Sequence, residues 1–216
     1  VTNEELGLHL SKPIILMVDE YGKANPAVKN ALLRLMLERK IGSYTLHPDS
    51  IVFATTNLDT DGVGDNIKAH TIGRITRVTV RPSTAEEWLA WAVNNGVDPV
   101  VMAWVNQFPH CLASYTDGLQ ESNPYPYNPK KVQMAYVSPR SLEGASRIVR
   151  NRSQLSENAL VSALTGTLGE AAARDMQAFV EYQDQLPAWD AIIKSPTAAV
   201  VPNSPGACAV MVFGAI

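Results

Sequence analysis

Two neighbouring carboxylates stand directly after an apolar run and are the residues best placed to do chemistry. The run covers residues 14–18, and the carboxylates are Asp19 and Glu20. An Asp in this position can hold a hydrated magnesium ion, and a neighbouring Glu can orient or deprotonate an attacking water. Phosphoryl transfer requires both functions, because it depends on positioning and on charge neutralisation. The alternative is a solvated acidic turn after a strand, and the pair alone does not decide between the two.

Three further polar residues could serve the same chemistry. Asn57 closes a second apolar run, and its amide can hydrogen-bond both a phosphate oxygen and a water. Arg74 precedes a third apolar run, and Arg140 occupies the first turn of an expected helix, where a cation opposes the helix dipole. A guanidinium stays protonated and donates in a planar fork, which suits phosphate oxygens. The structural alternatives are a turn residue and surface arginines, and Arg77 and Arg81 are rivals to Arg74.

The elements expected to position these residues begin with an α/β layer. Strands are predicted at 14–18, 51–55 and 75–80, and the continuous apolar character of the first is typical of a strand covered on both faces. A helix is predicted from Pro26 to about Arg39, because Asn-Pro supplies a cap and a first helical residue. The buried face of this helix is expected to carry Val28, Ala31, Leu32 and Leu35.

After residue 82 the pattern becomes helical. Capping signals occur at Ser83–Glu86, Asp98-Pro99 and Ser138-Pro139, and helical periodicity continues over 156–164 and 169–182. The stretch from Ser114 to Lys131 is expected to be a loop, and 195–206 a Pro-rich irregular tail. We therefore predict a partial α/β domain at 1–82 and an all-α domain at 83–216. The apolar residues 207–216 are about half of the length of a membrane span, so a buried terminal segment is expected.

Composition narrows the classes of function. The sequence has 46% apolar and 18% charged residues and a net charge of −3, so it gives no electrostatic reason for general nucleic-acid or membrane binding. Its two cysteines, Cys111 and Cys208, are too few for a disulfide framework, which favours a cytoplasmic location.

The order of these features resembles the AAA+ ATPases, and within them the MoxR-like branch of bacteria and phages. It consists of an apolar strand with Asp-Glu, a helix, a strand ending in Ala-Thr-Thr-Asn, an Arg before a third strand, and Ser-Pro-Arg in a helical region. The segment 18–39 is close to the pattern of that branch, and the resemblance covers about residues 13–150. It implies the carboxy-terminal part of a parallel-sheet nucleotide-binding domain, followed by a helical lid.

The resemblance also implies roles for particular residues. Asp19 and Glu20 match the Walker B motif, with Asp19 as the magnesium ligand and Glu20 as the catalytic base. Asn57 matches the first sensor, which contacts nucleotide and catalytic water, and Arg74 matches the arginine finger that reaches a neighbouring subunit. Arg140 matches the second sensor, which contacts nucleotide from the lid. The expected cofactors are ATP and Mg²⁺, and the expected partners are a homo-oligomeric ring, commonly a hexamer, and a client protein.

Two departures from the family pattern affect these expectations. The finger is usually Asp-Arg-Phe, whereas this chain has Gly73-Arg74-Ile75. The phosphate-binding pattern Gly-x-x-x-x-Gly-Lys-[Ser/Thr] does not occur in the sequence, and in the family it lies upstream of the Asp-Glu strand. We therefore expect the amino-terminal part of the fold to be missing and the chain by itself to be inactive.

Three hypotheses follow. The first is a truncated ATPase that drives protein remodelling or assembly, and the second is a degenerate AAA+ scaffold or ring subunit that does not hydrolyse ATP. The third is a nucleic-acid motor, in which Tyr115, Tyr125 and Tyr127 stack bases near Lys130 and Lys131. For these residues an ordinary loop rich in Pro and Tyr is the favoured interpretation.

Overall fold

A computed structural model of the chain describes residues 12–57, 69–118, 121–184, 186–187 and 189–215. The fold is mixed α/β, mostly helical, with a small parallel pair of strands. It divides into two compact units, Val1–Thr79 and Val80–Ile216, which are called the first and second unit below. Asp19, Glu20, Asn57 and Arg74 belong to the first unit, and Arg140 belongs to the second.

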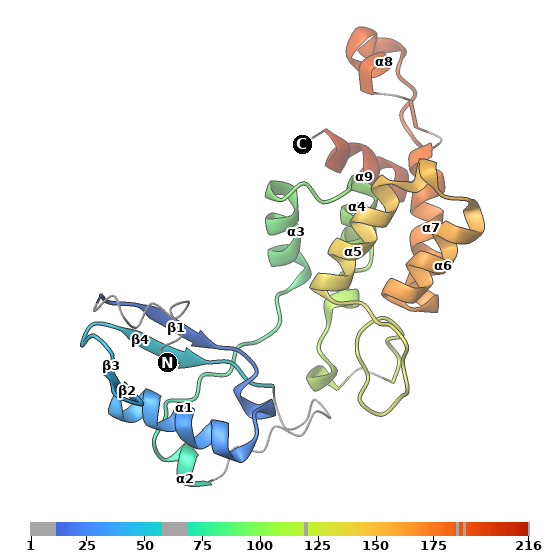
Figure 1. Ribbon diagram of the computed structural model, residues 1–216. Helices are drawn as coiled ribbons and strands as arrows, with labels where there is room; N and C mark the ends of the chain where they lie inside the picture. Colours follow the sequence, from blue (N-terminus) through green and yellow to red (C-terminus); the bar gives the residue numbers. More distant parts are fainter. Residues whose placement is uncertain (1–11, 58–68, 119–120, 185, 188, 216) are drawn as a thin grey trace. The chain divides into compact units, whose positions relative to one another are not determined.

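The first unit is built around two parallel strands that lie side by side (Figure 1). Strand β1 pairs with β4 in a register that places Ile15 opposite Ile51 and Val18 opposite Ala54. The described elements of this unit are β1 (Ile15–Val18), the 3-10 turn η3 (Tyr21–Lys23), α1 (Pro26–Glu38), β2 (Lys40–Ile41), β3 (Tyr44–Thr45), β4 (Ile51–Ala54) and α2 (Ala69–Ile72). Strands β2 and β3 form a separate antiparallel hairpin after α1.

The third predicted strand is wrong. Residues 75–80 have no regular secondary structure, although Val78 and Val80 are residue types that favour strands. Both valines are exposed, at 77% and 85%, and β1 and β4 pair only with each other among the described residues. A strand requires a neighbour to receive its backbone hydrogen bonds, so strand propensity alone did not produce one here.

The expectation that both faces of the first strand are covered is also wrong. Ile15 and Met17 are 74% and 53% exposed, and their partners across the pair, Ile51 and Phe53, are 56% and 44% exposed. Because side chains alternate along a strand, these four residues share one face of the pair. We call this face the open sheet face.

Helix α1 begins as predicted, because the Asn25 side chain accepts a hydrogen bond from the Val28 backbone N–H at 3.0 Å. The predicted buried face is only partly correct. Leu35 is buried and Leu32 half-buried, whereas Val28 and Ala31 are exposed. Leu33 is buried instead, so the apolar periodicity misjudged which side of the helix is covered.

The second unit is a helical bundle. Helix α4 packs against α3, α5, α7 and α9, and α6 packs against α5 and α7. Its helices are α3 (Ala85–Asn94), α4 (Pro99–Gln107), α5 (Pro139–Arg150), α6 (Glu157–Leu168), α7 (Glu170–Asp184), α8 (Trp189–Lys194) and α9 (Pro205–Gly214). Short 3-10 turns lie at η5 (Pro109–Leu112), η6 (Tyr115–Asp117), η7 (Arg152–Gln154) and η8 (Pro196–Ala198).

The helix starts of this unit follow the capping signals. Asp98 caps α4 and Ser138 caps α5, each followed by Pro at the first helical position. The first box is shifted by one residue, because Thr84 caps α3 together with Glu87. Residues 199–204 are irregular as predicted, and η8 precedes them. The predicted buried terminal segment is confirmed in part, since α9 packs on α4 and α7 and buries Ala207 and Val210.

The core of the second unit surrounds α4. Trp104 is completely buried and packs edge-on against Tyr125, with ring centroids 5.4 Å apart. Fully buried side chains from α4, α5, α6 and α7 complete this core, among them Val101, Leu142, Leu164 and Met176. No helix in the described ranges has both the length and the apolar content needed to cross a membrane.

Candidate functional site

The acidic pair lies in a turn at the carboxyl end of β1, beside the carboxyl end of β4. In open parallel sheets this edge is where ligands collect. The backbone N–H of Thr55 donates to Val18 O at 2.9 Å, and the Tyr21 N–H donates to Thr55 O at 2.9 Å. One residue after β4 thus bonds the chain immediately before and immediately after Asp19-Glu20.

The Asp19 carboxylate is held through one of its two oxygens. Its Oδ1 accepts the Thr55 hydroxyl in a short hydrogen bond, and it also accepts the Glu20 backbone N–H at 3.1 Å. The same N–H lies 3.2 Å from Thr55 Oγ1. Oδ2 has no hydrogen-bond partner within the described part of the chain, so this oxygen can accept a water or a metal ion.

Glu20 has an unusual backbone conformation and a charged partner. Its φ of 52° and ψ of 40° lie in the left-handed region, which is disfavoured for a residue with a Cβ. Its side chain is 54% exposed, and Oε1 lies 2.6 Å from the Lys23 ammonium. Such an exposed pair contributes little to stability, and it orients the carboxylate only weakly.

Tyr21 directly follows the acidic pair and fixes the turn to the helices α1 and α2. The side chain is 5% exposed, and its hydroxyl donates to the Lys29 carbonyl in α1 at 3.3 Å. Burial raises the pKa of Tyr21, and a hydrogen bond with the Thr71 side chain of α2 opposes that rise. The turn is therefore fixed to the end of β4 through Thr55 and to α1 and α2 through Tyr21.

The structure places the remaining predicted residues as follows. Asn57 is half-buried and lies two residues beyond Thr55, at the same end of β4. Arg74 is exposed, its backbone N–H donates to Thr71 O at 3.0 Å, and its guanidinium has no hydrogen-bond partner among the described residues. Its predicted position immediately before a strand is incorrect, because no strand follows, and Arg77 is likewise exposed.

Arg140 lies where the sequence predicts, in the first turn of α5. The side chain is exposed, and it makes no ion pair or hydrogen bond with a described residue. Arg147 and Arg152 of the same unit, in contrast, pair with Glu143 and Asp184. A cation at a helix N-terminus is disfavoured by the dipole, and no described residue pairs with Arg140 to compensate it.

The residues around Asp19 fit a magnesium ion held mainly by phosphate oxygens and water. Mg²⁺ commonly uses one or two carboxylates in such sites and takes its other ligands from substrate and solvent. Asp19 supplies an oriented carboxylate with one oxygen lacking a described partner. In the ranges that the structure describes, no group of three or more His, Cys, Asp or Glu residues could hold a metal by itself.

One of the three tyrosines considered for base stacking lies in the core of the second unit. Tyr125 is 7% exposed within the core, and its hydroxyl donates to Asp175 Oδ2 at 2.8 Å. Burial, followed by the neighbouring Asp175, raises the pKa of Tyr125. Lys130 and Lys131 both lie within ion-pair distance of Glu121. Tyr125 is therefore inaccessible to a base, which removes one part of the proposed stacking surface.

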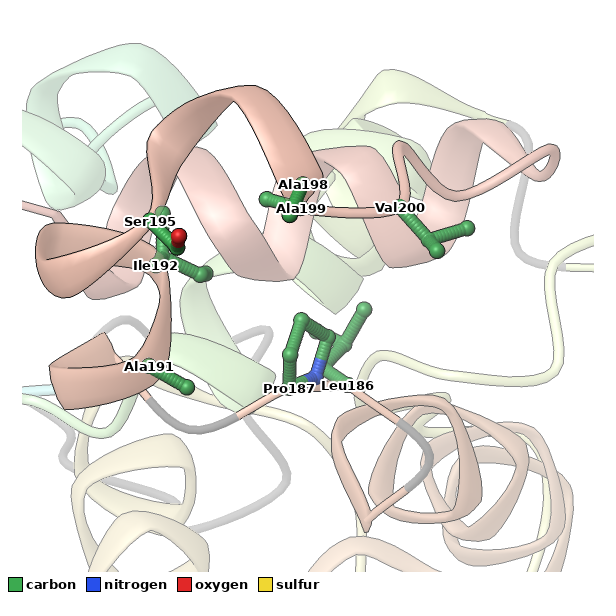
Figure 2. Close-up of a pocket in the computed structure, with 8 residues that line it drawn as sticks. All are labelled: Leu186, Pro187, Ala191, Ile192, Ser195, Ala198, Ala199 and Val200. Carbon is green, nitrogen blue, oxygen red and sulfur yellow. The ribbon is translucent and has the colours of Figure 1, made fainter.

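A separate cavity of about 490 Å³ lies in the carboxy-terminal segment of the second unit (Figure 2). Among the described residues that line it, Ser195 is the only polar one and none is titratable. The lining consists of Leu186, Pro187, Ala191, Ile192, Ser195, Ala198, Ala199 and Val200. This chemistry offers no acid, base or charge, so the cavity is not a candidate for catalysis.

Sequence reasoning missed Thr55 and Lys23 as parts of this site. Thr55 was taken only as the end of a strand, although a hydroxyl directly after an apolar run can hydrogen-bond a neighbouring turn. The signal for Lys23 is its spacing of three residues from Glu20, which brings opposite charges together on a helical turn.

The chain has no match among protein-family models, curated proteins or solved structures.

Proposed function

We propose that the chain is part of an AAA+ ATPase of the MoxR-like kind, which hydrolyses ATP to drive remodelling or assembly of a client protein. The observation that carries the proposal is the acidic turn at the carboxyl edge of the parallel pair, with Asp19 fixed by Thr55 and Asn57 two residues away. The order of motifs along the sequence adds to it. The 216-residue chain lacks the phosphate-binding pattern, so we propose that it does not hydrolyse ATP by itself.

Each residue then has a definite task. Asp19 would hold a hydrated Mg²⁺ through Oδ2, the oxygen without a described hydrogen-bond partner, and Glu20 would accept a proton from the attacking water. The Asn57 amide orients that water and contacts a phosphate oxygen. When bound, Mg²⁺ supplies neutralisation of the phosphate charge.

The two arginines complete the proposal. Arg74 and Arg140 have no described side-chain partner, and both are exposed, as a residue that meets phosphate must be before the ligand binds. Arg74 reaches the nucleotide of an adjacent subunit, and Arg140 contacts nucleotide from the helical unit. This assignment requires a homo-oligomeric ring, proposed as a hexamer, located in the cytoplasm.

The test is ATP hydrolysis by the chain together with whatever coding sequence lies upstream of Val1 in the same reading frame. Glu20→Gln should lower kcat by about 10²-fold or more, because a general base contributes that much. Asp49→Asn is the matched control, since Asp49 is a 79% exposed carboxylate of the same unit. Equal hydrolysis by Glu20→Gln and its parent would contradict the assignment of the base.

A second candidate is a degenerate ring subunit or scaffold that does not hydrolyse ATP. The ion pair between Glu20 and Lys23 favours it, because an ammonium bound to the carboxylate competes with an attacking water for the same oxygen. A start codon at Val1, together with assembly into rings without nucleotide, would support this candidate. An in-frame phosphate loop some tens of residues upstream would support the ATPase.

A further inference from the structure

We propose that Thr55 is a positioning residue for the acidic pair, and that its hydroxyl sets the orientation of Asp19 and the backbone of Glu20. The inference rests on the proposed function for its catalytic consequence. Its structural content stands on contacts that do not depend on ATP.

Thr55 makes four contacts around a turn of two residues. Its backbone bonds Val18 on one side and Tyr21 on the other, each at 2.9 Å. Its hydroxyl donates to Asp19 Oδ1 and lies 3.2 Å from the Glu20 N–H. The backbone bonds hold the ends of the turn, and the hydroxyl holds its interior.

A hydroxyl is suited to this position because it both donates and accepts. The donated proton goes to the Asp19 carboxylate, which accepts only, and the oxygen lone pairs face the backbone N–H of Glu20. Serine can make both contacts, whereas valine has nearly the same shape and can make neither. This difference separates the role of the hydroxyl from that of side-chain volume.

The left-handed conformation of Glu20 explains why the contacts of Thr55 are needed. A residue with a Cβ is disfavoured in this conformation, so surrounding contacts have to maintain it. In this turn the two carboxylates have different hydrogen-bond partners. Asp19 is held by Thr55 with one oxygen lacking a described partner, while Glu20 is directed to Lys23.

The consequence for the proposed reaction concerns orientation more than affinity. A metal ligand and a base have to be fixed relative to one another, because small displacements of reacting groups cost large factors in rate. Loss of the Thr55 hydroxyl should therefore lower kcat and change KM for ATP little. A purely structural role would lower the amount of folded protein without this split.

The first arm of the test measures backbone hydrogen exchange by NMR in the 216-residue chain. In Thr55→Val, the Glu20 N–H should exchange about tenfold faster than in the parent. The substitution removes one of its acceptors, Thr55 Oγ1, and the hydroxyl that holds the other, Asp19 Oδ1. Thr55→Ser should restore the parent rate. Thr45→Val is the matched control, since Thr45 is an exposed strand residue of the same unit, and it should leave Glu20 unchanged.

If Thr55→Val does not fold, Asp19→Ala removes the other end of the same hydrogen bond at an exposed position and should raise the Glu20 exchange rate similarly. Parent-like exchange of Glu20 in Thr55→Val, or in Asp19→Ala when only the latter folds, would overturn the inference. Failure of Thr55→Ser to restore protection would also overturn it.

The second arm uses the ATPase assay on the protein with its upstream sequence. Thr55→Val should lower kcat about tenfold with little change in KM, and Thr55→Ser should recover it. If no protein hydrolyses ATP, or if Glu20→Gln has no effect, the proposed function fails while the exchange result still decides the role of Thr55. If Glu20→Gln abolishes hydrolysis and Thr55→Val leaves kcat unchanged, the positioning role in catalysis is refuted.

Discussion

The two units of this chain bury their apolar residues in different ways. The second unit surrounds Trp104 with side chains that are fully buried, whereas the first unit exposes half or more of Ile15, Met17 and Ile51 on the open sheet face. Parallel strands are normally covered on both faces, so the first unit departs from the usual arrangement. Both non-glycine residues with positive φ in the described ranges, Glu20 and Arg39, also lie there.

This difference separates most of the apolar core from most of the proposed site residues. Burial of apolar area is the dominant stabilising contribution in folding, and most of the closely packed core belongs to the second unit. The first unit carries the acidic turn and its disfavoured backbone. Four of the proposed site residues, Asp19, Glu20, Asn57 and Arg74, thus lie in the unit with the smaller core, whereas Arg140 lies in the second unit.

The largest effect should come from truncating the core of the second unit. Trp104→Ala is expected to lower the free energy of unfolding by about 3–5 kcal/mol, because it leaves a cavity in a fully buried site. Phe53→Ala on the open sheet face should cost less than about 1 kcal/mol, since Phe53 is already 44% exposed.

The four tryptophans, at positions 88, 91, 104 and 189, all lie in the second unit. Denaturant unfolding followed by tryptophan fluorescence therefore reports on this unit, and amide exchange in β1 reports on the first. Equal losses of unfolding free energy for the two substitutions would show that the open sheet face is covered in solution. That result would contradict the difference in burial between the two units.

A pair of glycine substitutions in the second unit should have opposite signs. Gly169 has a φ of +86°, and a Cβ there would lie 2.9 Å from Ala135 O, so Gly169→Ala should destabilise by about 1–3 kcal/mol. Gly166 lies within α6 with open space around it, so Gly166→Ala should stabilise by about 0.5–1 kcal/mol. Thermal unfolding of the two variants checks this, and a gain in stability for Gly169→Ala would contradict the close packing described.

In the first unit, relief of backbone strain should give a smaller gain. Glu20→Gly and Glu20→Ala both remove the carboxylate, but only Gly removes the Cβ that disfavours the left-handed conformation. Glu20→Gly should be more stable than Glu20→Ala by about 1 kcal/mol. Exchange of the Tyr21 amide, which bonds Thr55, measures the local opening of this turn. If Ala is the more stable variant, Glu20 is not strained.

The smallest effect should be a pH dependence at the start of the second unit. Hydrogen bonds from Arg81 and then from the Thr84 backbone hold the pKa of Glu87 at about 2, below the ordinary 4.5. A lowered pKa means that this carboxylate stabilises the folded form above about pH 4.5, and the contribution is lost as the pH falls toward 2. Glu87→Gln should flatten this part of the stability profile. The side chain is half exposed, so the effect should weaken in high salt.

Local features of the fold could be predicted from the sequence because their causes are local. The starts of α1, α4 and α5 follow from Asn25, Asp98 and Ser138, each of which caps its own helix within three residues. The apolar run before Asp19 likewise predicted β1. The same reasoning failed at residues 75–80, because strand formation depends on a partner elsewhere in the chain.

The candidate site divides in the same way. The types and order of its polar residues follow from the sequence, with Asp19 and Glu20 after one apolar run and Asn57 after another. The hydrogen bond from Thr55 to Asp19, across 36 residues of sequence, and the left-handed conformation of Glu20 could be seen only in the fold. Residues adjacent in sequence predict local features such as helix caps. The contacts of Thr55, in contrast, exist only because β1 and β4 pair in one register and bring their ends together.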